Sequence, residues 1–151
     1  MKPFHFRLQR LLRLKVAEKG QCALALGRSR HELGMREDEL RAAEDRHGSM
    51  TESYLRLADK PSCPSDWILG RNALDAAHRR VQERQTAVQQ AATRVEEARL
   101  RLVEQSREVE AYQRLRRKAW EEHNREVQRT VQKDIDATAG EKFTRSAAPR
   151  G

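Results

Sequence analysis

The sequence has few of the large apolar side chains that fill a globular core. Aromatic residues make up only 5% of its 151 residues and hydrophobic residues 37%, whereas 36% are charged. The longest wholly apolar run is the short segment from Cys22 to Leu26, so no transmembrane segment is expected. The length alone would suggest one globular domain, but this composition is typical of a coiled coil.

Cysteines and enzyme motifs are also scarce. Cys22 and Cys63 belong to no CxxC motif or Cys/His cluster, so we expect no metal site. Two thiols without a secretory signal indicate a reducing cytosol. The sequence contains no P-loop, HExxH or GxSxG motif, and a helical hairpin lacks the concave pocket that catalysis needs. We therefore expect no catalytic residues, no cofactor and no enzymatic activity.

What the sequence does contain is a regular apolar seam between residues 74 and 109. Its second row, three residues later, is mostly small or aromatic, with Arg84 and Gln105 as exceptions. A seam this narrow predicts a helix that wraps around one partner helix. The seam also opposes disorder, which is the competing interpretation of so polar a chain. The first row is Leu74, Val81, Val88, Val95, Leu102 and Val109.

A weaker seam with the same period precedes the first one. No proline occurs between Phe4 and Lys60, and one row there is mainly Leu, interrupted by Lys19 and His47. The segment Lys60–Asp66 carries two prolines and predicts a turn, after which Ser65 or Asp66 is expected to cap the next helix. Two long amphipathic helices joined by a short turn pack antiparallel.

The sequence therefore predicts an all-α protein, an antiparallel coiled-coil hairpin over residues 1–139. We expect a first helix over about 4–59, a turn over 60–66 and a longer second helix over about 67–139 that overhangs at its C-terminal end. Gly140 is expected to end that helix, and residues 140–151 to form a flexible tail. Pairing about the turn brings together residues whose numbers sum to about 125, so Phe4 should lie near Trp120 or Glu121.

Two irregularities interrupt this pattern. After Val109 the next seam residue on the second helix is Trp120, an 11-residue step that is typical of a stutter. On the first helix, Gly20, Gly27 and Gly34 fall seven residues apart on the outer face. Each glycine costs about 1 kcal/mol relative to alanine. The sequence leaves open whether they only add flexibility or allow close approach of a partner.

Positive charge is concentrated at the N-terminal end. The net charge is +8, and residues 1–30 hold eight Lys or Arg against one acidic residue, Glu18. An acidic protein surface, anionic lipid or nucleic acid could each bind such a patch. A basic zipper needs a continuous basic block, whereas leucines such as Leu8 and Leu12 interrupt this one, so we expect no nucleic-acid partner.

Both ends of the chain resemble a known family. The segment from Phe4 to Lys15 (FHFRLQRLLRLK), followed by Glu18, is similar to the N-terminal signature of FliJ, the flagellar export chaperone family. The acidic pattern Asp134-Ile135-Asp136 departs from the adjacent acids that are commoner in the family. The C-terminal residues that carry the resemblance are Val109, Glu110, Leu115, Lys118, Trp120, Glu126 and Asp134.

The resemblance implies a cytosolic, stalk-like chaperone of the type III flagellar export apparatus, located at the inner face of the cell membrane at the flagellar base. The implied partners are the hexameric export ATPase, the cytoplasmic domain of the export-gate membrane protein and substrate-specific export chaperones. The ATPase contact is expected at Phe4, Phe6, Arg7, Leu8, Arg10, Leu11, Arg116, Arg117, Trp120, His123 and Val127. The gate contact is expected at Trp67, Ile68, Ala73, Leu74 and Ala77.

Several alternatives remain open at this point. Phe4 and Trp120 either lock the open end of the hairpin or contact a partner, and Trp67 either caps the turn or contacts the gate. The equivalent stalk of a virulence-type secretion system would show the same pattern. So would a generic structural coiled coil that dimerises through its weaker seam.

Overall fold

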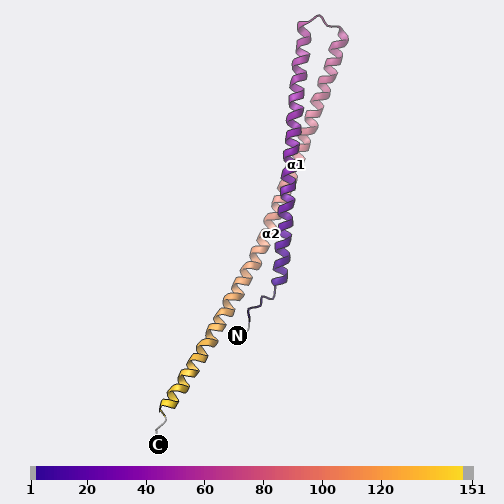
Figure 1. Ribbon diagram of the computed structural model, residues 1–151. Coiled ribbons are helices and arrows are strands. Elements are labelled where there is room, and N and C mark those ends of the chain that lie inside the picture. Colours follow the sequence, from indigo (N-terminus) through magenta and orange to yellow (C-terminus); the bar gives the residue numbers. More distant parts are fainter. Residues whose placement is uncertain (1–2, 148–151) are drawn as a thin grey trace. The chain divides into compact units, whose positions relative to one another are not determined.

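The structure is a computed structural model that describes residues 3–147, with side chains described as far as Gly140. Within that range it contains two long helices and no strand (Figure 1). Helix α1 spans Gln9–Leu55 and continues into the short 3-10 helix η1, Arg56–Asp59; helix α2 spans Pro64–Ala147. The predicted all-α hairpin with a longer second helix is confirmed.

The chain divides into two compact units, each of which pairs a piece of α1 with a piece of α2. The first, here called the terminal unit, comprises Met1–Glu18 and Ser106–Gly151. The second, the turn unit, comprises Lys19–Gln105. The predicted ATPase contacts therefore belong to the terminal unit and the predicted gate contacts to the turn unit.

The predicted seam is the buried surface of the turn unit. Its most buried residues are Leu26, Ala77 and Ala91, at 7%, 7% and 3% exposure. The row from Leu74 to Leu102 is half-buried throughout. Arg84, the polar exception in the second row, is exposed. The heptad period thus identifies correctly which faces of the helices meet.

Contacts between the helices confirm the predicted register. Arg84 Nη1 of α2 lies 2.7 Å from Glu39 Oε2 of α1, a pair whose residue numbers sum to 123. The rings of His47 and His78 are 5.7 Å apart, and these numbers sum to 125. The register follows because the short turn fixes where both helices start and the seam fixes which residues face each other.

The start of α2 differs from the prediction. The helix begins at Pro64, so Ser65 and Asp66 lie within its first turn rather than before it as caps. Asp66 reaches back, and its Oδ2 accepts a hydrogen bond from the Cys63 backbone N–H at 3.2 Å. Proline is favoured at the first helical position, where its missing N–H costs nothing, so the helix starts about one turn earlier than its apolar pattern suggests.

Aromatic packing closes the turn unit beside the turn. The rings of Tyr54 and Trp67 meet edge to face at 5.4 Å, a favourable geometry for an aromatic pair. Gly70 lies directly under Tyr54, and a Cβ atom at this position would be only 2.8 Å from Tyr54 Cδ2. Trp67 therefore closes the turn end, one of the two roles that the sequence left open for it.

The outer ends of both helices also differ from the prediction. α1 begins at Gln9 rather than near Phe4, and residues 3–8 are not helical. The Gln9 N–H donates a hydrogen bond to Phe6 O at 3.0 Å. α2 runs past Gly140 to Ala147, since no described glycine has the positive φ of a helix-ending cap. The predicted tail begins inside α2, and residues 148–151 lie outside the described part. The limits 1–139 and 140–151 for the coiled coil and its tail stay a prediction.

The exposed glycines of α1 should be replaceable with a gain in stability. A Cβ atom at Gly27 would meet nothing within 4 Å, so Gly27→Ala removes only the conformational freedom of glycine. We expect the free energy of unfolding to rise by about 1 kcal/mol, measured by urea denaturation followed by circular dichroism. An unchanged or lower stability would contradict this expectation.

Gly70→Ala is the matched control, because the same substitution meets the Tyr54 ring there. We expect a net loss of about 1 kcal/mol, since overpacking typically costs 1–3 kcal/mol and the better helix propensity recovers part of it. A gain comparable to that of Gly27→Ala would show that Tyr54 moves aside freely.

Candidate partner-binding site

The N-terminal segment packs against α2 as non-helical chain, with a turn at Arg7 and Leu8 before α1 begins. Phe6 is only 8% exposed and forms a small core with Leu12 and Val109. Phe4 and Leu8 pack against the same core. Phe4, Phe6 and Leu8 alternate with polar residues, and all three contact this core. This alternation was the sequence signal against a helix from Phe4 onward.

Phe4 and Trp120 lie at the edge of this core. The Phe4 ring is 5.6 Å from that of His123, and Phe4 shares an open hollow with Trp120, Arg116 and Arg117. Trp120 remains 51% exposed. Phe6, not Trp120, therefore seals the end of the coiled coil, and Trp120 is left with an accessible aromatic face.

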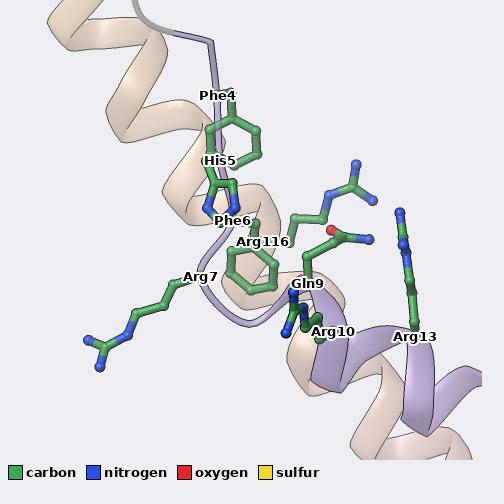
Figure 2. A pocket seen from close by; sticks show the side chains of 8 residues that line it. All are labelled: Phe4, His5, Phe6, Arg7, Gln9, Arg10, Arg13 and Arg116. Carbon is green, nitrogen blue, oxygen red and sulfur yellow. The ribbon is translucent and has the colours of Figure 1, made fainter.

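Arginines surround a second hollow of about 380 Å³ beside the N-terminal segment. Figure 2 shows Arg13 and Arg116 on the same side of it, whereas Arg7 points away from both. No carboxylate lines this hollow, so its electrostatic character is positive. The lining residues are Phe4, His5, Phe6, Arg7, Gln9, Arg10, Arg13 and Arg116.

The nearby carboxylates are held by other cations. Lys15 Nζ lies 2.8 Å from Glu108 Oε2 of α2 and 2.9 Å from Glu18 Oε2 of its own helix. Hydrogen bonds with Glu108 and then Glu18 raise the pKa of Lys15, so it is fully charged at neutral pH. Arg114 lies 3.7 Å from Glu110. These acids are therefore not paired with the arginines of the hollow.

The predicted ATPase-contact residues all fall in the terminal unit, in three environments. Phe6 is buried; the arginines and Trp120 are exposed; the others are half-buried. Arg13 and Gln113 line the same hollows and were not among the predicted residues. Arg13 was detectable in principle, because it lies three residues after Arg10 on the same helix face.

The predicted gate-contact residues do not form one surface. Leu74 and Ala77 belong to the seam and face α1, whereas Ile68 is 64% exposed. Ala73 and Ala77 line a shallow hollow of about 590 Å³ in the turn unit together with Met50. These residues share a stretch of sequence, but the helix turns them toward different sides.

Metal-ligand clusters and membrane-spanning helices are both absent from the part of the chain that the structure describes. Between residues 3 and 140, no group of three or more His, Cys, Asp or Glu side chains is placed to hold a metal ion. No helix of the described part is long and apolar enough to cross a membrane.

Comparison with known proteins gives this architecture a family. The family described as flagellar FliJ protein matches residues 4–148. The chain belongs to the FliJ family. This is a family of structural and chaperone proteins of flagellar type III export rather than a family of enzymes. No curated protein sequence matches the chain.

A solved structure shows the same fold. The YscO homologue CT670 from Chlamydia trachomatis superimposes with a TM-score of 0.62 at 15% sequence identity. The match covers 96% of this FliJ-family chain and 99% of the other. At this level of identity the similarity concerns the fold alone.

Stability measurements should separate the seal of the terminal unit from its accessible surface. Phe6→Ala removes a buried ring, and we expect the free energy of unfolding to fall by about 3 kcal/mol. Trp120→Ala removes a half-exposed ring and should change it by less than about 1 kcal/mol. Thermal and urea unfolding of both variants would test this, and equal losses would show that Trp120 is part of the seal.

Proposed function

We propose that the protein is a stalk-like chaperone of flagellar protein export whose terminal unit binds the hexameric export ATPase. One observation carries this proposal: in the terminal unit of a FliJ-family chain, arginines without carboxylate partners surround an exposed tryptophan. Arginine and tryptophan are the residue types that most often dominate binding energy at protein interfaces.

The directions of the arginines suit a partner that surrounds the helices. Arg7 points away from Arg13 and Arg116 (Figure 2), so a partner on one side would leave part of the cluster unused. A ring-shaped hexamer offers contacts on every side. The C-terminal part of α2 supports this as well, because residues 131–139 are all exposed and so are accessible to the inside of a ring.

The proposed gate contact lies in the turn unit. Ile68 is largely exposed and Ala73 lines an open hollow, so these two residues are the accessible members of the predicted set, on different sides of the helix. The other three residues of the predicted gate contact lie in the seam and support this part of α2 from within: Trp67, Leu74 and Ala77. Through these exposed residues the protein would meet the cytoplasmic domain of the export gate at the inner face of the membrane. At that place it also escorts substrate-specific chaperones. It performs no catalysis of its own.

The test is stimulation of the cognate export ATPase by the purified protein. We expect the wild type to raise ATP turnover or hexamer formation, and the triple variant F4A/R10A/W120A to lose at least tenfold in apparent affinity. Arginine and tryptophan, the types of Arg10 and Trp120, are common hot spots in alanine scanning. Near the centre of an interface, truncating such a residue typically costs about 2 kcal/mol or more of binding free energy.

A matched control also replaces two apolar residues and one arginine by alanine, but in the turn unit. L24A/R28A/L100A replaces exposed residues there and should stimulate the ATPase as the wild type does. Circular dichroism verifies that both triple variants remain helical. Full stimulation by F4A/R10A/W120A would remove the assignment of the site.

The stalk of a virulence-type secretion system and a structural coiled coil are the rival functions. Restoration of motility in a flagellated host that lacks its own family member would favour the flagellar role. A tight homodimer in sedimentation, with no effect on an export ATPase, would favour the structural coiled coil instead.

A further inference from the structure

The terminal unit segregates its charges. Residues 3–18 and 106–118 contain nine Lys or Arg and only three acidic residues. Two of the nine cations, Lys15 and Arg114, hold all three acids in ion pairs. None of the other seven is ion-paired with a carboxylate in the described part of the chain. Within these two stretches seven cations are thus left without a carboxylate partner, although Glu122, further along α2, lines a hollow with Arg7 and Lys118.

Lys15 is central to this arrangement because of where it lies. It occupies a seam position of α1, its side chain is 22% exposed, and it binds Glu108 across the seam and Glu18 along its own helix. It therefore holds two carboxylates away from the arginines while contributing little surface itself. An apolar residue at this position would pack in the seam but leave both acids free to pair with those arginines.

We infer that the surface met by the terminal unit is rich in carboxylates, and that Lys15 is a positioning residue that keeps the arginines unpaired for it. The inference rests on the proposed function and names the chemistry of the partner at that same site. Guanidinium groups bind carboxylates through two parallel hydrogen bonds, so arginines without internal partners match an acidic protein surface.

A protein partner fits this surface better than a lipid bilayer or a nucleic acid. A bilayer presents its headgroups in one plane, and a duplex meets a helix pair on one side. Arg7 and Arg116 line the same hollow but point in different directions (Figure 2). Trp120 lies beside Arg116 and Arg117 and adds an aromatic contact of fixed position, which favours a structured acidic surface.

The first experiment measures the affinity for the cognate export ATPase at increasing salt. Raising NaCl from 0.1 to 1 M shortens the Debye length from about 10 to about 3 Å, and we expect the dissociation constant to rise at least tenfold. R10A/R116A should weaken binding at low salt and flatten the salt dependence, whereas R28A/R79A, exposed arginines of the turn unit, should match the wild type. Tight binding that does not depend on salt would overturn the inference.

The second experiment tests Lys15 itself. Lys15→Met should weaken binding by about fivefold at 0.1 M salt, roughly the effect of one charge pair, and reduce its salt dependence, while Lys15→Arg should retain both. A purely structural role would lower thermal stability without changing the salt dependence of binding. Unchanged salt dependence in Lys15→Met would therefore overturn the role of this residue, and thermal unfolding verifies that both variants are folded.

Other polyanions complete the test. Vesicles with 30% phosphatidylserine and a 20-base-pair duplex should bind more weakly than the ATPase at physiological salt; equal or tighter binding to either would overturn an acidic protein partner. Absence of ATPase binding at every salt concentration would instead contradict the proposed function. Salt-independent ATPase binding would leave that function standing and remove only the present inference.

Discussion

A pair of helices has one interface, and everything else in this protein depends on how narrow that interface is. Each helix contributes about two residues per heptad to the interface, so even the best-buried side chains keep some contact with water, and none of those described between residues 3 and 140 is below 2% exposure. Stability therefore comes from many modest burials in series rather than from a core. In return, most of both helices remains accessible, which suits a protein whose work is to contact others.

Such an interface has to be closed at its ends, and the two units do this by different means. In the turn unit, Tyr54 and Trp67 pack edge to face beside the prolines of the turn. In the terminal unit the described chain has no turn that joins the two helices, and the non-helical N-terminal segment inserts Phe6 beside Leu12 and Val109. Because Phe6 takes this role, Trp120 is not needed for the seal, and its half-exposed ring is accessible to a partner.

Sequence reasoning recovered what depends on periodicity and missed what depends on local chemistry. The heptads predicted both helices, the buried faces and the register, because the seam in this chain is set only by spacing. They placed the start of α1 at Phe4, whereas residues 3–8 are not helical and the chain turns at Arg7 and Leu8 before the helix begins. They also missed the Asp66 contact to Cys63 and the helical conformation of Gly140, which backbone hydrogen bonds decide. The family resemblance placed the gate contact on the early part of the second helix and so grouped Ile68 with Leu74, two residues that the helix points to different sides.

Charge is where the seam and the partner surface influence each other. A lysine at a seam position normally weakens a coiled coil, since a long cationic side chain replaces a packed apolar one. Lys15 offsets this by binding Glu108 across the seam, and the same contact withdraws a carboxylate from the neighbouring surface. A leucine at this position would improve the seam and at the same time release Glu18 and Glu108 toward the arginines. The polar interruption in an otherwise regular heptad therefore affects the neighbouring surface as well as the seam, and that surface is the one proposed above to meet a partner.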